Sequence, residues 1–338
     1  MARATLPTKC SPKWSATDGH HTGNDKGVFV NSNDLLGNPL KTSRNRVCVF
    51  ADEAKPDKHC KWLFIGYLLI PSLRIESAFN QLQQLRVRAN YLKEIHFNQL
   101  DNHSKSPFGT KTALAKSWLQ TVAQDATKTW HFHFMGINIE KLEVAAFGHD
   151  REEDTIYNRF FRSGLKYALK HSFDMPIHVD SICHDETHME LDPYFRWHTI
   201  QKFAETELNI TNASSEIEFV TSDHEDARCK DRVSAEFLQM TDIVLGSFRQ
   251  SFFATSGKAG KTELATTVIP LLERVTDQKR KSNPNSSFQH YRRVSAGFFP
   301  RHKLTRQQLE DEFARSLSGF YINEPLRIKR IHQTSLEL

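Results

Sequence analysis

Five short apolar runs alternate with longer helical patterns along the chain, and their order constrains the fold more than any other feature. The runs are rich in β-branched and aromatic residues, which is typical of buried strands. In order they read RVCVFADEA, KWLFIGYLLIP, WHFHFMGINIE, MPIHVDSI and EIEFV. The first two adjoin each other and helical spacing separates the rest. Such an order predicts an α/β body, a mixed sheet with helices on both faces.

The turn-forming residues between these runs agree with that order. A short polar turn with Pro56 and Asp57 joins the first two runs and predicts a hairpin, and Pro71 ends the second strand. The segment KEIHF, which follows the first helix, is short and predicted to be extended. Helices are predicted over Leu73–Leu92, Lys111–Gln124, Glu153–His171, Pro193–Leu208, Ser234–Phe253, Lys261–Val275 and Thr305–Ser318.

Composition divides the chain into three parts. Residues 1–45 are polar, without sustained periodicity, and are predicted to be a flexible extension. Residues 46–255 hold the α/β body, and residues 256–338 form a helical, basic C-terminal extension.

Several protein classes are excluded by the sequence. No apolar run reaches the ~18 residues that span a bilayer, so no membrane partner is expected. The first residues contain no apolar segment typical of a secretory signal. The five cysteines are scattered and odd in number, which argues against a disulfide framework. We therefore expect a soluble protein of the reducing cytoplasm.

Charge is unevenly distributed along the chain. The net charge is +5, from 45 basic and 40 acidic residues, yet residues 279–303 hold seven basic residues and no acidic one. An acidic body with basic flanks suits a metal-dependent enzyme acting on a polyanion, because carboxylates hold cations and the periphery holds phosphates. The alternative interpretation is that the basic segments are simply solvated.

Four acidic residues stand where carboxylates are costly. Asp52 and Asp180 end apolar strand patterns, Asp242 lies within an apolar helix pattern, and Glu94 follows the first helix. An ionised carboxylate away from water costs several kcal/mol unless it is paired or binds a metal. A shared Mg²⁺ or Mn²⁺, one or two ions, explains all four at once. Individually, the strand-end aspartates could cap turns, Asp242 could pair with an arginine, and Glu94 could be a surface acid.

Several of these motifs together resemble the domain-of-unknown-function 3800 family, of the ribonuclease H-like clan. The resemblance covers roughly residues 46–255. It rests on FADEA, FIGYLLIP, EIHF and HVD in this order, on the helix SAEFLQMTDIVLGSF, which is similar to the family's Leu-Gln-x-x-Asp helix, and on RRVSAGFFP beyond. The chain departs from the family in having Lys55 where a glycine usually follows the first acidic motif.

The resemblance implies a fold and a site. The implied fold is a ribonuclease H-like mixed sheet of five strands with helices on both faces. Asp52 corresponds to the carboxylate of the first strand, Asp180 to that of the central strand, Asp242 to that of the late helix, and Glu94 to the glutamate after the first helix.

The hypothesis that follows is a metal-dependent nuclease acting on RNA or DNA. The four carboxylates would hold the metal, and a metal-bound water would attack a phosphodiester. Glu53 and His96 are further candidates, for orienting a ligand or moving a proton. The alternatives are transfer to a hydroxyl at the same site, or a non-catalytic module that binds nucleic acid or a protein partner.

The basic C-terminal segment is the predicted nucleic-acid surface. Its basic residues are Lys279, Arg280, Lys281, Arg292, Arg293, Arg301 and Lys303. They are interleaved with aromatic residues, which suits phosphate neutralisation combined with base stacking. The competing interpretation packs Phe298 and Phe299 against the body and leaves the arginines in water.

One motif resembles a nucleotide-binding loop without meeting its requirements. The stretch SGKAGKT, at Ser256–Thr262, has Thr255 where a phosphate loop needs glycine, and a helical pattern rather than a strand precedes it. We therefore predict no nucleotide site there.

Overall fold

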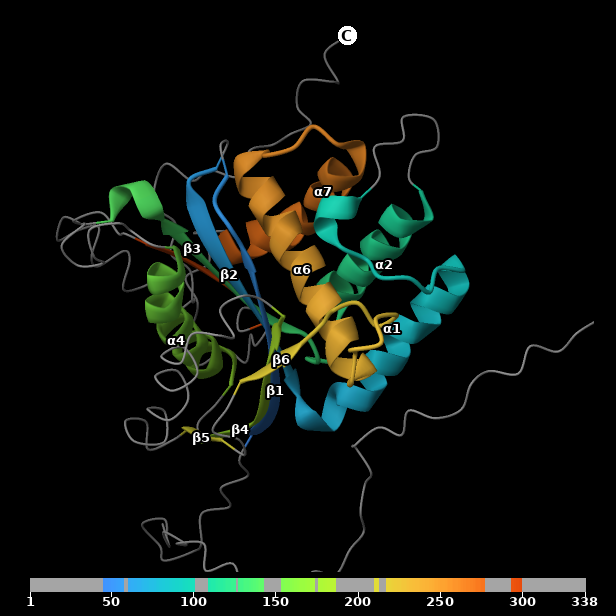
Figure 1. Ribbon diagram of the computed structural model, residues 1–338, viewed down its shortest axis with the longest axis horizontal. Helices are drawn as coiled ribbons and strands as arrows, with labels where there is room; N and C mark the ends of the chain where they lie inside the picture. The colour runs from blue at the N-terminus through green and yellow to red at the C-terminus, as the bar shows by residue number, and fades with distance from the viewer. Residues whose placement is uncertain are drawn as a thin grey trace, which may run out of the picture. The chain divides into compact units, whose positions relative to one another are not determined.

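The computed structural model describes residues 45–57, 60–100, 109–125, 127–142, 153–173, 176–186, 210–212, 217–276 and 293–299, which all belong to one compact unit. Strands and helices alternate as the sequence predicts (Figure 1). The strands are β1 (Asn45–Ala54), β2 (Trp62–Pro71), β3 (His131–Asn138), β4 (Ile177–Asp185), β5 (Ile210–Asn212), β6 (Glu218–Val220) and β7 (Val294–Phe299). The helices are α1 (Ile75–Ala89), α2 (Thr110–Gln124), α4 (Glu153–Ser172), α6 (Arg232–Phe253) and α7 (Ala259–Thr276), with short 3-10 turns η1 (Ser72–Arg74), η2 (Phe97–Gln99) and η3 (Ile139–Lys141).

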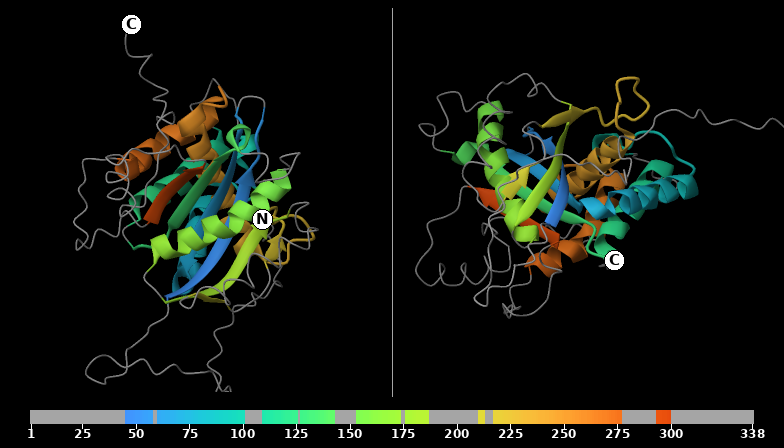
Figure 2. Two further views of the ribbon diagram at one scale, coloured as in Figure 1. Left: turned by 90° about the vertical axis from the view of Figure 1, so that its left-hand side faces the viewer. Right: turned by 90° about the horizontal axis from the view of Figure 1, so that it is seen from below.

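The described strands form one mixed sheet of seven strands. Their order is β5-β4-β1-β2-β3-β7 (Figure 2). Strand β6 also pairs with β4, along Cys183–Asp185, whereas β5 pairs with Ile177–Val179 of the same strand. Strand β2 runs antiparallel to β1 and β3, whereas β1–β4, β3–β7, β4–β5 and β4–β6 are parallel pairs. Because β1 and β4 run parallel, the residues at their carboxyl ends lie at the same end of the sheet.

The prediction of five strands is wrong in number, although each of the five runs does form a strand. The two additional strands are β5, which has only three residues, and β7, whose sequence is VSAGFF. A three-residue strand is too short to show a period. The small residues of β7 give only a weak apolar pattern. Strand β7 and helix α7 both lie in the segment predicted to be a helical extension, yet they pack on the same sheet and helices as the rest.

Helices cover both faces of the sheet, as predicted. Helix α4 covers one face, and α1, α2, α6 and α7 cover the other (Figure 1). Successive residues of β1 point alternately to the two hydrophobic cores: Cys48 and Phe50 face α6, and Val47, Val49 and Ala51 face α4. The predicted helices at 193–208 and 305–318, and nearly all of the predicted extension at 1–45, lie outside the described residues.

Helix α6 is the most deeply buried helix of the described part of the chain. Its N-terminus is capped by Asp231, whose carboxylate accepts a hydrogen bond from the Val233 amide at 2.9 Å. Its apolar residues then pack against β1 and β2, as in the contact of Phe237 with Phe50, whose ring centroids are 4.9 Å apart. An acidic side chain on this helix is therefore held in a fixed place under the sheet.

Gly246 lets the segment of η2 approach α6 closely. A Cβ atom at this position would lie 2.2 Å from the ring of Phe97, far inside contact distance. The ring of Phe97 therefore occupies the space that any other residue at position 246 would fill.

Replacing Gly246 by alanine is expected to destabilise the protein by about 1–3 kcal/mol, because the Phe97 ring must move out of a packed site. Gly257→Ala is the matched control, since a Cβ there meets no atom within 4 Å. Urea denaturation measures both. Equal free energies of unfolding for the two variants would show that the close approach is not needed for stability.

None of the helices in the described ranges is both long and apolar enough to cross a bilayer.

Candidate functional site

Two carboxylates meet at the carboxyl ends of the parallel strands β1 and β4. The last residues paired between these strands are Ala51 and His184, so Asp52 and Asp185 come next in register. Both point to the face covered by α6, because Phe50 and Cys183, two residues earlier on each strand, belong to the core on that face. Asp52 is buried, with 8% of its surface exposed.

Helix α6 brings a third carboxylate to the same place. Asp242 lies on the side of α6 that faces the sheet, and 18% of its side chain is exposed. Burial, followed by repulsion from Asp242 and Asp185, raises the pKa of Asp52 well above its ordinary value. Burial also raises the pKa of Asp242, and the pKa of Asp185 rises to about 6, mainly through burial with a contribution from Asp242. Asp52, Asp185 and Asp242 thus form a mutually repelling group, called here the carboxylate cluster.

The expected partner Asp180 does not join this cluster. Its carboxylate is bound by Arg46, with an Nη2–Oδ1 distance of 2.8 Å, and accepts a hydrogen bond from the Ser72 hydroxyl. His178 also lies near, with Nε2 at 3.4 Å. Asp180 therefore sits beside the beginning of β1, five positions before Asp185 along β4. The prediction that Asp180 converges with Asp52 and Asp242 is wrong, because β4 continues past the point where the sequence pattern was taken to end.

Glu94 is linked to the cluster by hydrogen bonds of Ser222. It lies in the extended segment between α1 and η2, and its Oε1 is 3.2 Å from the hydroxyl of Ser222. The same hydroxyl is 3.3 Å from Oδ2 of Asp185, and the Ser222 amide donates to Oδ1 of Asp185 at 3.1 Å. Since one hydroxyl carries one proton, Glu94 and Asp185 compete for it. The structure thus places Glu94 at the rim of the cluster.

His96 lies beside Asp242. Its Nδ1 is 3.3 Å from Oδ2 of Asp242 and 3.1 Å from the amide nitrogen of Asn98. The amide of Phe97 donates to the same Asp242 oxygen at 2.6 Å. Both contacts favour the ionised form of Asp242 and oppose the effect of burial. Because the Asn98 amide donates to Nδ1, this nitrogen has no proton to donate to Asp242, and the structure places His96 only as a neighbour of the cluster.

Glu53 points to the opposite face of the sheet. Its Oε2 lies 3.5 Å from Nε2 of His184, and that nitrogen also contacts the hydroxyl of Tyr157 on α4. Because neighbouring residues of a strand alternate between faces, Glu53 cannot share a ligand with the side chain of Asp52 on the α6 side. The structure separates Glu53 from the carboxylate cluster.

A buried polar network holds the two loops that flank the cluster. Gln239, one turn before Asp242 on α6, accepts a hydrogen bond from the Ile95 amide at 3.0 Å and donates to the Ser222 carbonyl at 2.6 Å. Arg86 donates to the same Gln239 oxygen at 2.6 Å. One glutamine therefore ties the loop of Glu94 and the loop of Ser222 to the helix that carries Asp242.

Arg86 is itself fixed by a buried ion pair. Its Nε lies 2.5 Å from Oε1 of Glu236, and both side chains are 0% exposed. It also donates to the Lys93 carbonyl at 2.7 Å and lies 4.8 Å above the ring of Trp118. Such a pair is costly to break, because the remaining charge would stay buried without a partner.

Of the predicted nucleic-acid residues, only Arg293 lies in the described ranges. It is buried and contacts Asp125, with Nη1 at 3.3 Å from Oδ2 and a further hydrogen bond to the Asp125 carbonyl. The prediction that Arg293 meets phosphates in solvent is wrong, because its charge neutralises a buried carboxylate next to β7. Phe298 is buried in the core on the α6 side and Phe299 packs against the core on the α4 side, as the competing interpretation held, although that interpretation placed the arginines in water and Arg293 is buried. Lys279, Arg280, Lys281, Arg292, Arg301 and Lys303 lie outside the described residues.

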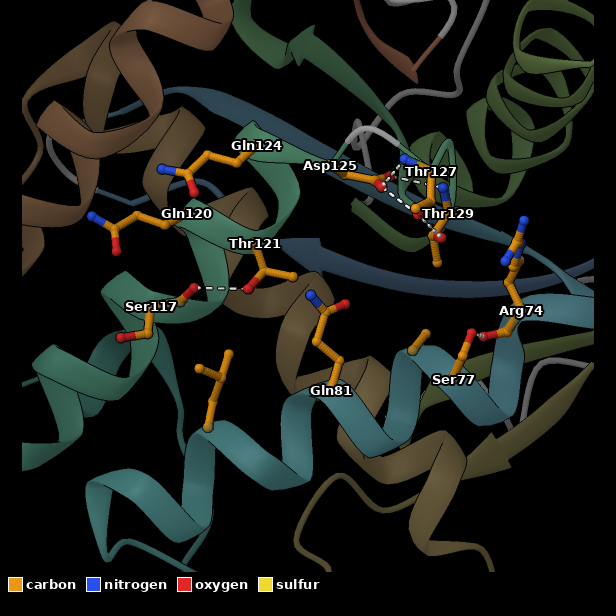
Figure 3. Close-up of a pocket in the computed structure, with 12 residues that line it drawn as sticks. Arg74, Ser77, Gln81, Ser117, Gln120, Thr121, Gln124, Asp125, Thr127 and Thr129 are labelled. Carbon is orange, nitrogen blue, oxygen red and sulfur yellow. Dashed lines mark hydrogen bonds between the residues drawn. The ribbon is translucent and has the colours of Figure 1, made fainter.

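A polar pocket of about 590 Å³ lies between α1 and α2 (Figure 3). Gln81, Gln120 and Gln124 line it, and Asp125 closes one end. Burial alone would raise the pKa of Asp125, but hydrogen bonds from the Thr127 hydroxyl and from the backbone amides of residues 127, 129 and 130 outweigh it and lower that pKa. Asp125 is therefore satisfied by the turn that follows α2, and none of the cluster carboxylates lines this pocket.

The donor set of the carboxylate cluster fits a hard divalent cation. Its oxygens are the ligands that Mg²⁺ and Mn²⁺ prefer, and within the described ranges neither a lysine nor an arginine pairs with Asp52, Asp185 or Asp242. Their mutual repulsion would be relieved by a cation between them. In the same part of the chain, however, no three such side chains already stand at ligand distance.

Comparison with known proteins leaves the family open. No protein-family model matches the chain, and a search among curated proteins also finds no match. The resemblance to the domain-of-unknown-function 3800 family therefore stays a prediction.

Two residues at the cluster, Asp185 and Ser222, were not predicted from the sequence. A signal for Asp185 was present, since Ile182 and Cys183 continue the apolar pattern of β4 beyond Asp180. Ser222 lies in an irregular loop, and no local pattern in the sequence distinguishes it from other serines.

Arg86→Met is expected to destabilise the protein by about 3–5 kcal/mol, because Glu236 would keep a buried charge without its partner. The double variant Arg86→Met/Glu236→Met should recover part of this loss. Arg88→Met, which alters an exposed residue of the same helix, is the control and should change stability by less than about 0.5 kcal/mol. Urea denaturation gives all three values, and equal losses for Arg86→Met and Arg88→Met would contradict the role of the buried pair.

Asp185→Asn is expected to stabilise the metal-free protein at about pH 8, by roughly 1–2 kcal/mol, and to have little effect near pH 4. The pKa of Asp185 is raised to about 6 in the folded state. The folded protein therefore binds this proton more tightly than the unfolded chain, and the stability contributed by Asp185 falls as the pH rises from about 4 through 6. Asparagine removes that loss.

Asp226→Asn is the matched control for this pH dependence. Arg228 lowers the pKa of Asp226, so that its removal should act in the opposite direction and cost stability at the higher pH. Thermal melting across the pH range measures both variants. A parallel pH profile for Asp185→Asn and the wild type would contradict the electrostatic strain of the cluster.

Proposed function

We propose that the protein is a metal-dependent phosphodiester hydrolase, a nuclease acting on RNA or DNA. The observation that carries this proposal is the convergence of Asp52, Asp185 and Asp242 from two parallel strands and one helix. Folding alone would select against one buried and two partly buried carboxylates that repel one another. Their retention without a lysine or arginine at ion-pair distance in the described ranges is understandable if a cation completes the site.

In this proposal Asp52, Asp185 and Asp242 would hold one or two Mg²⁺ or Mn²⁺ ions. Such an ion, when bound, activates water as a nucleophile and stabilises the leaving oxygen of a phosphodiester. Glu94 and Ser222 would orient Asp185 from the rim, since Ser222 contacts both carboxylates. His96, at 3.3 Å from Asp242, would move a proton to or from the reacting group.

The fold is consistent with the ribonuclease H-like assignment that the resemblance implies. A mixed sheet carries a carboxylate at the end of its first strand, a second on the adjacent parallel strand, and a third on a late helix. Within the resemblance, Asp185 takes the place first given to Asp180. Fold analogy alone does not establish an activity, so the proposal depends on the site.

A second candidate is a non-catalytic module that binds nucleic acid or a protein partner. The observation favouring it is that Asp180, one of the expected metal ligands, is paired with Arg46 instead. This candidate predicts binding without cleavage, and the same experiment therefore separates the two.

Labelled RNA and DNA incubated with Mn²⁺ should be cleaved by the wild-type protein, and EDTA should stop the cleavage. Asp52→Asn and Asp185→Asn should each lower the rate by roughly a hundredfold or more, because each removes an oxygen ligand of the metal. Asp180→Asn is the matched control, since its carboxylate is bound by Arg46 away from the cluster, and it should stay within about tenfold of the wild type.

Two outcomes would overturn the proposal: cleavage that persists in EDTA, or equal rates in the wild type and both cluster variants. Loss of activity in Asp180→Asn with full activity in Asp185→Asn would instead restore the original assignment of the central-strand carboxylate.

A further inference from the structure

A basic side chain, Lys261, lies next to the carboxylate cluster, and two further basic residues, Arg249 and Lys258, lie near Lys261. Arg249 lies on the last turns of α6, Lys258 precedes α7, and Lys261 lies in the first turn of α7. Burial lowers the pKa of Lys261, and the neighbouring charges of Lys258 and Arg249 lower it further, so each of these two cations is close enough to Lys261 to repel it. Lys258 and Lys261 belong to the stretch SGKAGKT, for which the sequence offered no role, whereas Arg249 lies on α6.

The surrounding protein neutralises this basic group only in part. Arg249 pairs with Asp57 at 2.7 Å, but its buried Nε has no hydrogen-bond partner within the described ranges. Across the same ranges, neither Lys258 nor Lys261 has a carboxylate within ion-pair distance. Cations at the beginning of a helix are also disfavoured by the helix dipole. Helix stability therefore does not explain two lysines at the start of α7, whereas a bound anion would.

Contacts join the basic group directly to the site. The Lys261 ammonium lies 3.0 Å from Oδ1 of Asn98 and 4.8 Å above the ring of Phe97. The amide of Phe97 donates to Asp242 at 2.6 Å, and Lys261 and Asp242 attract each other. Lys261 thus packs on Phe97, whose backbone amide holds the Asp242 carboxylate in place.

We propose that Arg249, Lys258 and Lys261 form a phosphate-binding subsite that holds a non-reacting phosphate of a polynucleotide next to the carboxylate cluster. The inference rests on the proposed function in that the reacting phosphate would lie at the cluster. A lysine ammonium is a compact charge with three donors, which suits a backbone phosphate without regard to base sequence. The alternative is that Lys261 serves only as a counter-charge to Asp242, in which case it contributes nothing to binding.

The test measures binding separately from cleavage. Fluorescence anisotropy in EDTA follows a short labelled single-stranded oligonucleotide, as DNA and as RNA, over a range of salt concentrations. The variant is Lys258→Met/Lys261→Met, because methionine keeps an apolar stem over the Phe97 ring while removing the charge. Lys170→Met, on α4 across the sheet, is the matched control for loss of a lysine. Lys258→Arg/Lys261→Arg tests whether charge alone suffices.

The double methionine variant should bind roughly tenfold more weakly, and its slope of log affinity against log salt should fall by about one. The control should behave as the wild type, and the arginine variant should retain most of the affinity. An unchanged salt slope in the methionine variant, or no measurable binding by the wild type, would overturn the subsite.

The outcomes also separate the subsite from the nuclease proposal. If the wild type does not cleave with Mn²⁺ but the methionine variant loses affinity, the subsite stands and the hydrolase proposal fails. If the wild type cleaves and the methionine variant binds and cleaves equally well, the reverse holds.

Discussion

The buried ion pair between Arg86 and Glu236 is the interaction on which the arrangement of the site depends. It ties α1 to α6 where neither charge has access to water, so the two helices cannot shift without exposing an unpaired charge. Gln239 extends the pair to both flanking loops, and Asp242 follows one turn later. One side of α6 therefore carries Glu236, which holds the helix against α1, Gln239, which binds both loops, and Asp242 of the cluster. The next residue on this side, Gly246, leaves room for the ring of Phe97.

The repulsion within the cluster lowers the stability of the folded protein. Asp52, Asp185 and Asp242 each have a raised pKa, mainly because folding removes them from water. The hydrogen bonds they accept come from backbone amides and from Ser222, which hold the carboxylates in position without cancelling their charge. The rest of the fold, above all the two packed cores on either side of the sheet, must supply the stability that this group removes.

Sequence patterns predicted the elements better than their ends. Every predicted helix and strand that falls in the described residues is present, and most of them are long enough to show a period. Strand β4 ends five residues beyond Asp180, and for this reason Asp180 rather than Asp185 was expected beside Asp52. Asp52 and Asp242 do lie on the packed side, since Asp52 ends an apolar strand pattern and Asp242 lies within an apolar helix pattern. Ser222 and the partners of Arg293 depend on contacts between distant segments, which no local pattern reveals.

The pairing of β7 with β3 has a consequence for how the chain is made. Phe132 pairs with Val294, so one side of β3 stays without its neighbour until residues 294–299 have left the ribosome, more than 150 residues after β3 itself. Until then the backbone N–H and C=O groups on that side of β3 are unpaired, and such an edge strand is a site at which nascent chains aggregate. Strands β1, β2 and β4 need no such wait, and the carboxylate-bearing centre of the sheet can assemble first. A chain truncated after α7 would keep the residues of the cluster but would expose the unpaired edge of β3 and tend to aggregate. Dependence on chaperones should therefore be greatest at that stage of synthesis.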